Sequence, residues 1–250
     1  MFYKYALPDI ICLLFTSSTA AFAPRFGLTR PMKGAVTTLE MATGGSLNVK
    51  AVGIGSAAPP TILTNNDLES VVETSDEWIA TRTGISQRRV LIQNEDSTNQ
   101  RLSALSSTAA AEALAMSGLL PTDIDLIVMC TSSPDDLFGD ATTVQAALGC
   151  TNAVAFDLTA ACSGFLFGSV TAGQFLSNGG NNMKNALVIG GDALSRWVDW
   201  DDRNSCILFG DGAGAMVLSK CDGSDDGSQA GLLGFSMHSN GESHGDLICG

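Results

Sequence analysis

The chain has 250 residues, 45% of them hydrophobic, and its 13 basic and 26 acidic side chains give a formal net charge of −13 at pH 7. This length allows one large domain or two small ones, and the acidity argues against broad binding to nucleic acids or anionic membranes. The seven cysteines form no CxxC pair and have no metal-like spacing with His238 and His244, so we expect free thiols rather than a metal site or a disulfide framework.

The N-terminal segment is predicted to be a two-part targeting leader outside the fold. Residues 1–21 contain Lys4, a short apolar stretch and then small residues, as in a signal peptide. Residues 22–45 begin with Phe-Ala-Pro and carry basic residues with no acidic residue before Glu40, as in a transit peptide. The pair resembles the bipartite leader of proteins sent to the secondary plastids of algae and predicts a plastid stromal protein. A secreted protein is the alternative, and the absence of paired cysteines weighs against it.

The first predicted elements of the fold follow this leader. Residues 47–59 form a predicted strand that ends in small residues and two prolines. Asn65 or Asn66 is expected to cap a helix. Residues 74–77, with Thr first and Glu three residues later, match a capping box that opens a second helix. That helix is expected to end near Gly84.

Strands and helices continue to alternate along the rest of the chain. The predicted strands are residues 125–132, 153–158, 185–194 and 214–220, and the predicted helices are residues 103–117, 141–148 and 163–177. Continuous apolar strands alternating with helices are typical of an α/β sheet covered on both faces. Residues 221–231 are rich in Gly, Ser and Asp and predict an exposed connection.

Cys162 lies between a predicted strand and a predicted helix, in the stretch Ala-Ala-Cys-Ser-Gly. This order places the sulfur at a helix N-terminus, where the helix dipole and free backbone N–H groups favour thiolate over thiol. The same N–H groups could stabilise an oxyanion on a thioester carbonyl. The small neighbours leave room for a substrate. A nucleophile and a small buried structural cysteine are the two interpretations that the residues allow.

Trp78 and Arg82 are four residues apart and share one face of their predicted helix. An indole beside a guanidinium can hold a flat base by stacking and cation–π attraction. A half-buried Trp beside a surface Arg is the alternative.

The glycine-rich stretch 209–218 raises the question of a phosphate-binding loop. A dinucleotide fingerprint needs a strand before the glycines and a helix after them. A β-like run follows here, so we interpret the stretch as a tight turn that enters a strand.

Four stretches occur in a distinctive order and spacing: TSDEWIATRTGISQRR (74–89), AFDLTAACSGF (155–165), DDRNSCILFGDGAGAMVLS (201–219) and HSNGESHGDL (238–247). Together they resemble β-ketoacyl-acyl-carrier-protein synthase III, the family of condensing enzymes that initiates type II fatty acid synthesis. The resemblance implies a thiolase-like αβαβα fold and a homodimer. Residues 46–222 would form its N-terminal half, and residues 223–250 would begin its C-terminal half.

The resemblance also implies a reaction. Cys162 would accept acetyl from acetyl-CoA, a double displacement that suits an activated thiolate. Malonyl-acyl carrier protein (malonyl-ACP) would then lose CO₂, and the carbanion would attack the acetyl-cysteine to give acetoacetyl-ACP. The substrates are CoA and ACP thioesters, and no cofactor or metal is implied. Phe138 would cross the dimer interface to close the acyl pocket of the other subunit, which would restrict the primer to a short acyl chain.

The resemblance assigns the CoA-binding side chains as a set: Trp78 and Arg82 flank the adenine, Thr74 and Arg203 help hold the nucleotide end, and Phe209 lines the pantetheine tunnel. Arg88 and Arg89 are expected either to contact the acidic carrier protein or to be ordinary surface charges.

The chain departs from the family pattern in two places. Gly139 stands where the family has Pro, which predicts a looser loop after Phe138. The family's catalytic His and Asn, and a glycine-rich oxyanion donor, lie in the second half, so we expect a truncated product that does not complete condensation alone. His238 and His244 are not expected to replace them, because their block matches a non-catalytic segment.

Other functions remain as alternatives to a β-ketoacyl-ACP synthase III. Within the same superfamily they are a type III polyketide synthase and a hydroxymethylglutaryl-CoA synthase. From another class, the alternative is a non-catalytic partner subunit or pseudoenzyme.

Overall fold

The computed structural model describes residues 47–92, 100–177, 182–221, 231–237, 239–243 and 245. The predicted leader in residues 1–21 and 22–45, together with His238 and His244, lies outside these residues. Within the described ranges, no helix is both long enough and apolar enough to cross a membrane.

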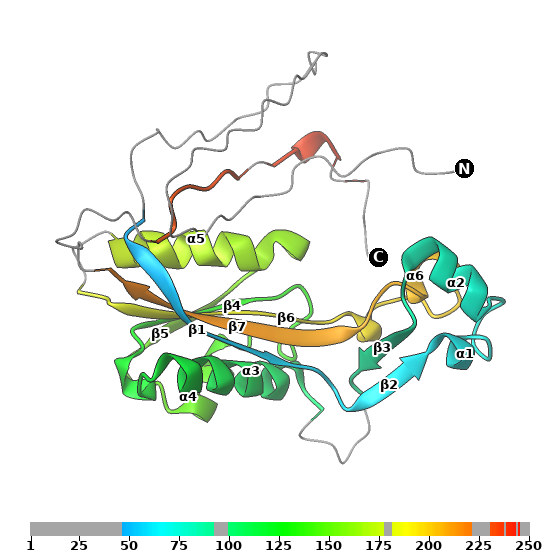
Figure 1. The fold of residues 1–250 in the computed structure, drawn as a ribbon, viewed down its shortest axis with the longest axis horizontal. Helices are drawn as coiled ribbons and strands as arrows, with labels where there is room; N and C mark the ends of the chain where they lie inside the picture. The colour runs from blue at the N-terminus through cyan, green and yellow to red at the C-terminus, as the bar shows by residue number, and fades with distance from the viewer. Residues whose placement is uncertain are drawn as a thin grey trace.

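A five-stranded mixed sheet forms the centre of the fold (Figure 1). Its strands are β1 (Val49–Ala57), β4 (Leu126–Cys130), β5 (Val154–Leu158), β6 (Asn185–Ala193) and β7 (Asp211–Lys220). They lie in the order β1-β7-β6-β4-β5. β4 is parallel to β5 and β6, whereas β7 is antiparallel to both β6 and β1.

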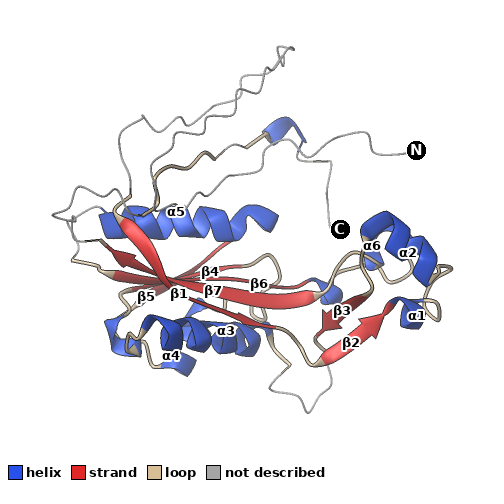
Figure 2. Ribbon diagram, viewed as in Figure 1, coloured by secondary structure: helices blue, strands red, loops and turns tan. Residues whose placement is uncertain are grey.

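Helices cover both faces of this sheet, as Figure 2 shows. The helices are α3 (Leu102–Ser117) and α4 (Ala141–Leu148) on one face and α5 (Gly164–Ser177) on the other. Short 3₁₀ helices connect other elements: η1 (Pro121–Asp123), η2 (Ala161–Ser163), η3 (Leu194–Arg196) and η4 (Gly241–Ser243). The predicted α/β sheet with two covered faces is therefore confirmed.

The central strand β4 shows why a continuous apolar run can serve both faces. All five of its residues are buried, and successive side chains of a strand point to opposite faces. Ile127 and Met129 pack in the core on the side of α3 and α4. Leu126 and Val128 pack in the core on the side of α5.

A second group of short elements lies at one end of the sheet, on the right in Figure 1. We call it the small lobe, and it comprises residues 61–90 and 203–207. Its elements are β2 (Thr61–Thr64), α1 (Asn65–Leu68), α2 (Asp76–Thr83), β3 (Gln87–Val90) and α6 (Arg203–Cys206). β2 and β3 pair antiparallel. The sequence did not predict β2, β3 or α6, because four residues carry too few repeats for a periodicity to be recognised.

Both helix caps expected in this lobe are out of place by one or two residues. α1 is capped by Thr64, whose side chain accepts from the Asp67 amide in a reciprocal capping box, and not by Asn65 or Asn66. α2 is capped by Ser75, whose hydroxyl accepts from the Trp78 amide at 3.1 Å. The expected capping box in residues 74–77 is therefore wrong, because Ser75 is the residue with extended backbone and a hydroxyl that reaches a free amide.

Two other local predictions are confirmed. α2 ends at Gly84, whose φ of +73° is the left-handed conformation expected of a C-cap glycine. Most of the glycine-rich stretch 209–218 belongs to β7 itself, which pairs along its length with β6. As predicted, it is not a phosphate loop, but the turn that enters the strand is confined to residues 209–210.

Candidate active site

Cys162 lies in the tight connection between β5 and α5. β5 ends at Leu158, η2 turns the chain, and α5 begins at Gly164. Ala161 has a positive φ of 47°, which costs a non-glycine residue roughly 1–2 kcal/mol and persists only where the surrounding structure enforces it. Cys162 itself is exposed. A small buried structural cysteine is therefore excluded at this position.

The surroundings of the sulfur suit a developing negative charge. Cys162 precedes α5 at the positive end of the helix dipole. The amides of Ser163 and Gly164 donate to the carbonyls of Ala160 and Ala161 within the turn. Among the described residues, the amide of Cys162 has no acceptor. Two of the free N–H groups expected here are thus used within the turn, and the Cys162 amide can donate to an oxyanion held against the sulfur.

Cys162 opens onto a cavity of about 500 Å³, a size in the usual range for small-molecule sites. The rest of its wall comes from β1, β4, β6, β7, η2, the start of α5 and the residue before β7: Ile54, Gly55, Cys130, Ala161, Phe165, Gly190, Gly191, Asp192, Gly210, Gly212, Ala213, Gly214, Ala215 and Met216. Sequence reasoning found only Cys162. The available signal was the run of Gly and Ala in residues 210–215, whose small side chains let a ligand approach the backbone.

Cys130 is the second thiol of the cavity wall, and its state is different. It is 3% exposed, and burial raises the pKa of its thiol to about 12. It therefore stays protonated at neutral pH and is a poor nucleophile. Gly168 of α5 lies against it: a Cβ at that position would be 2.3 Å from the Cys130 Sγ. Only glycine allows α5 to approach β4 this closely.

Trp78 contacts two arginines from separate parts of the chain. The Cζ atom of Arg82 is 4.3 Å from the centroid of the Trp78 ring, and that of Arg203 is 4.2 Å from it. The predicted shared face of Trp78 and Arg82 is therefore confirmed. Arg203 also donates to the carbonyl of Glu73 at 2.9 Å, between residues 130 positions apart.

A second cavity, of about 510 Å³, lies beside this cluster. Its wall consists of Val71, Val72, Glu73, Asp201 and Arg203. The small lobe therefore offers an indole, two guanidinium groups and an adjacent hollow.

Thr74 and Phe209 are not among the residues that line the two cavities. The Thr74 hydroxyl is buried and has no hydrogen-bond partner among the described residues. Phe209 is half-buried in the connection between α6 and β7 and lines neither cavity, although the next residue, Gly210, lines the cavity at Cys162. Their CoA-binding roles stay predictions.

Arg88 and Arg89 are not a surface pair for a carrier protein. Arg88 is 5% exposed, and its guanidinium donates to Ile207 and Asn65 inside the small lobe. Arg89 is half-buried and donates to the carbonyls of Pro59 and Pro60, both at 3.2 Å. The expectation that both are surface charges is wrong, since β3 turns Arg88 inward.

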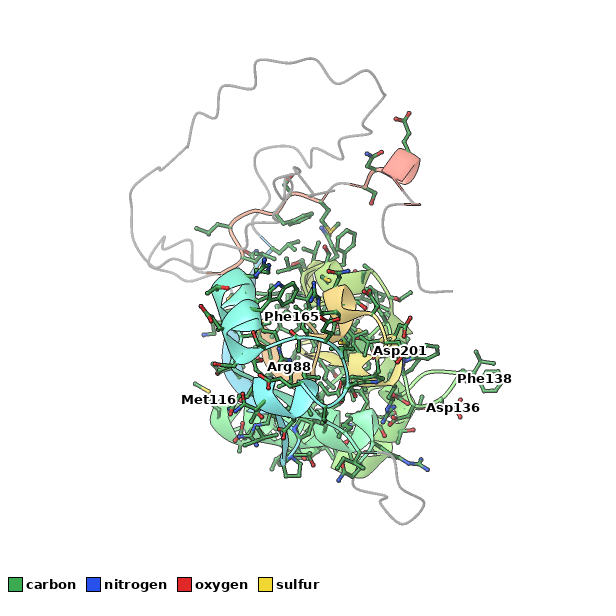
Figure 3. All side chains as sticks on the ribbon, turned by 90° about the vertical axis from the view of Figure 1, so that its right-hand side faces the viewer. Arg88, Met116, Asp136, Phe138, Phe165 and Asp201 are labelled. Atoms are coloured by element: carbon green, nitrogen blue, oxygen red, sulfur yellow. The ribbon has the colours of Figure 1, made fainter. Side chains whose placement is uncertain are left out.

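Phe138 lies at the tip of an exposed turn. It is 93% exposed and Leu137 is 91% exposed, and Figure 3 shows Phe138 and Asp136 extending away from the body. Gly139 has a φ of +95°, which Pro cannot adopt. A Cβ on it would lie 2.7 Å from the Asp157 carboxylate. Gly139 is therefore required by this turn and is not simply a looser substitute for Pro.

Across the part of the chain that the structure describes, no group of three or more His, Cys, Asp or Glu side chains is placed to hold a metal ion.

The sequence of this chain is similar to those of known proteins. The family model of 3-oxoacyl-[acyl-carrier-protein (ACP)] synthase III matches residues 156–241. Beta-ketoacyl-[acyl-carrier-protein] synthase III of Trichormus variabilis is 56% identical over 196 residues, which cover 78% of this chain and 56% of that protein. The chloroplastic protein of the same name from Arabidopsis thaliana is 54% identical over 194 residues, 77% of this chain and 45% of that protein. The chain thus spans about half the length of these curated relatives.

Solved structures lead to the same class. The 3-oxoacyl-[acyl-carrier-protein] synthase III of Aquifex aeolicus matches with a TM-score of 0.64 at 44% identity, over 70% of this chain and 54% of that one. The priming β-ketosynthase of the R1128 polyketide pathway matches with a TM-score of 0.64 at 30% identity, over 73% and 53%. The mixed sheet between helices, with a cysteine at the start of α5, is that of a thiolase-like protein. Within this class, the part of the chain that these relatives match belongs to the β-ketoacyl-ACP synthase III family.

Proposed function

We propose that the protein transfers acetyl from acetyl-CoA to Cys162, the first half-reaction of a β-ketoacyl-ACP synthase III. The observation that carries this proposal is the exposed Cys162 before α5, open to a cavity of about 500 Å³. The Cys162 sulfur attacks the thioester carbonyl and forms a new C–S bond, and the bond to the CoA sulfur breaks. The CoA thiolate leaves and takes up a proton. The Cys162 amide donates to the carbonyl oxygen while that oxygen is negative.

The second half-reaction is proposed for the whole protein, because the chain spans about half the length of its relatives. Malonyl-ACP loses CO₂, and the electron pair of the broken C–C bond forms an enolate. The enolate carbon attacks the acetyl carbonyl on Cys162, the sulfur leaves, and acetoacetyl-ACP is released. The high identity to proteins named synthase III supports this product over those of a type III polyketide synthase or a hydroxymethylglutaryl-CoA synthase.

We assign the nucleotide end of CoA to the small lobe. Trp78 presents an indole with guanidinium carbons at 4.2 and 4.3 Å. A flat adenine could take the place of one guanidinium on the ring and stack there. Arg82 and Arg203 also supply positive charge for the phosphates. Thr74 and Phe209 keep the roles that the family resemblance implies.

Further assignments concern assembly and location. Phe138 and Leu137 are large apolar side chains that stand almost fully exposed, as expected of a contact surface. We propose that Phe138 enters the acyl pocket of a second subunit and limits the primer to a short acyl chain.

The Arabidopsis relative is named chloroplastic, which supports a plastid location through the predicted leader in residues 1–45.

Acyl transfer can be tested directly with the purified protein. Incubation with radiolabelled acetyl-CoA should leave a stable label that peptide mapping locates on Cys162. Cys162→Ala should abolish the label, and Cys162→Ser should nearly abolish it, since a serine alkoxide is far harder to form near neutral pH. Cys150→Ala, at a buried thiol in the core beside α3 and α4, is the matched control. Label that persists in Cys162→Ala would overturn the proposal.

A further inference from the structure

The small lobe contains a buried arginine that has no acidic partner within the part of the chain that the structure describes. Arg88 is 5% exposed. Its Nε and Nη2 atoms donate to the Ile207 carbonyl at 3.0 and 2.5 Å, and Nη1 donates to Asn65 Oδ1 at 2.6 Å. All three hydrogen bonds end on neutral oxygens. Burial lowers the pKa of the guanidinium, and the nearby Cys206 opposes this change. A buried charge is costly unless its hydrogen bonds are satisfied, so its retention calls for a reason beyond filling space.

Asn65 extends the contacts of Arg88 to both ends of α2. Asn65 is 1% exposed, and its Nδ2 donates to Asp76 Oδ1 and to the Ile85 carbonyl, both at 2.8 Å. Asp76 is the first residue of α2, and Ile85 directly follows the C-cap of that helix. The side chain of Asn65 therefore fixes where α2 begins and where it ends.

Arg88 and Asn65 together connect the two helices that carry the proposed nucleotide contacts. α2 carries Trp78, and α6 carries Arg203. Ile207, the acceptor of two Arg88 hydrogen bonds, is the C-cap of α6. The path thus runs from α2 through Asn65 and Arg88 to the end of α6. Figure 3 looks onto this end of the molecule, with Arg88 near the middle of the body.

The helices themselves are too short to maintain this geometry. α2 has eight residues and α6 has four, and isolated helices of such length are not stable in water. The apolar core between them is a small cluster built on Leu68, Ile79, Cys206 and Ile207, and apolar packing is non-directional. The forked, planar guanidinium of Arg88 is directional, and it reaches both sides at once.

We propose that Arg88 and Asn65 are positioning residues that set the spacing between Trp78 and Arg203, and thereby the affinity for the adenine end of a CoA thioester. This inference rests on the proposed function, which it deepens by naming what determines nucleotide recognition. Neither residue touches the substrate. Both act through α2 and α6.

The first test compares two ligands. Binding of CoA and of 4′-phosphopantetheine, which lacks the adenosine part, is measured by titration calorimetry on the whole protein. Arg88→Met should weaken CoA binding roughly tenfold, because small misplacements of binding groups carry large penalties, and should leave phosphopantetheine binding unchanged. Arg88→Lys should fall in between, since one ammonium cannot reproduce the fork. Arg89→Met is the matched control: this neighbour on β3 donates to the carbonyls of Pro59 and Pro60, and its variant should bind both ligands normally.

A second variant separates positioning from simple stability. Asn65→Asp keeps an acceptor for Arg88 and gives it a counter-charge, but it removes the two Nδ2 hydrogen bonds to α2. The new carboxylate faces Asp76, which costs stability at α2, but its ion pair with Arg88 leaves no buried charge unpaired. The variant should therefore lose CoA affinity although its melting temperature falls less than that of Arg88→Met. If Arg88→Met does not fold, Asn65→Asp and Arg88→Lys decide the question by themselves.

The outcomes are distinguishable. If the unmodified protein binds no CoA, the proposed function fails and the inference fails with it. If it binds CoA and the Arg88 and Asn65 variants bind equally well, the inference alone is overturned. It is also overturned if CoA and phosphopantetheine lose affinity in parallel, or if CoA affinity simply follows the melting temperature across the variants.

Discussion

The sheet around Cys162 and the small lobe around Trp78 are stabilised by different interactions. The wall at Cys162 belongs to strands paired over up to nine residues, as between β6 and β7, and to two apolar cores on opposite faces. The small lobe has elements of four to eight residues, tied together by hydrogen bonds such as that from Arg88 to Ile207, 119 residues along the chain. The part proposed to perform chemistry is thus supported by many ordinary contacts, and the part proposed to bind nucleotide by a few side chains.

Two arginines, one half-buried and one buried, illustrate the same difference. Arg196, beside the main sheet, forms an ion pair with Asp135 at 2.7 Å. Among the described residues, Arg88 of the small lobe has only neutral acceptors. The ion pair of Arg196 therefore depends on the protonation state of Asp135. The hydrogen bonds of Arg88 depend on no titrating acceptor.

The largest expected effect concerns the two thiols of the cavity wall. Because burial raises the pKa of Cys130 to about 12, only about one part in 10⁴ of it is thiolate at pH 8. Iodoacetamide should therefore alkylate the exposed Cys162 on the order of 10³-fold faster than Cys130. Peptide mapping by mass spectrometry at timed intervals measures both rates. In denaturant the difference should disappear, and comparable rates in the folded protein would contradict the assignment.

The next effect tests the close packing behind Cys162. Gly168→Ala adds a methyl group only 2.3 Å from the Cys130 sulfur. This overpacking should lower the free energy of unfolding by about 1–3 kcal/mol. Adding Cys130→Ala should recover much of this loss, since the sulfur is removed. Urea unfolding of the two single variants and the double variant gives the coupling. Strictly additive effects would show that α5 and β4 are not in contact at this point.

A smaller effect is expected in the small lobe. Trp78→Ala and Arg82→Ala should each weaken CoA binding by about 1–2 kcal/mol, roughly tenfold, through loss of stacking. Binding of acetyl-pantetheine should not change, because it lacks the adenine. Calorimetric titration with both ligands distinguishes the cases, with Trp197→Ala, at an exposed indole outside the lobe, as the control. Equal losses for both ligands would indicate misfolding instead.

The smallest effect is a pH dependence on the side of the main sheet. Burial would raise the pKa of Asp135, but hydrogen bonds from Ser103, Arg196 and Leu102 outweigh it and hold this pKa below its usual value. A depressed folded-state pKa contributes stability that is present above the unfolded pKa of about 3.9 and is lost as the pH falls through the lower folded value.

Asp135→Asn should therefore reduce the gain in free energy of unfolding between pH 3 and pH 7 by about 1 kcal/mol. Urea midpoints across this pH range provide the measurement, with the exposed Glu112→Gln as the control. An unchanged pH profile in Asp135→Asn would place the acid sensitivity elsewhere. CoA binding by the small lobe should be unaffected by this substitution, in line with the separate support of the two regions.

Local sequence predicted the main sheet better than the small lobe, for a physical reason. β4 is a continuous apolar run, and the 16-residue α3 is a long, alanine-rich segment that ends at a glycine, so both can be recognised from the local sequence. β2, β3 and α6 have four residues each, and their conformations depend on tertiary contacts. The same limit explains the misplaced cap of α2, since Thr74 and Ser75 both offer a hydroxyl and only the fold decides which one meets a free amide.

The candidate site divides in the same way. The order of strand, small residues and helix around Cys162 was enough to predict a cysteine before a helix. That Cys162 is exposed, that Ala161 adopts a positive φ, and that β1, β6 and β7 supply the cavity wall could not be predicted, because these facts arise from strands distant in sequence.

By itself, the sequence determined the alternation of strands and helices, the position of Cys162 before α5, and the shared face of Trp78 and Arg82, because each depends on neighbours within one or two helical turns. Only the tertiary structure decided that Arg203 meets Trp78, that Arg88 is a buried connector and not a surface charge, and that Gly139 belongs to a turn closed against Asp157. Each of these requires groups far apart along the chain to be brought within hydrogen-bond or van der Waals distance. No local pattern of hydrophobicity or charge records which distant group will be there.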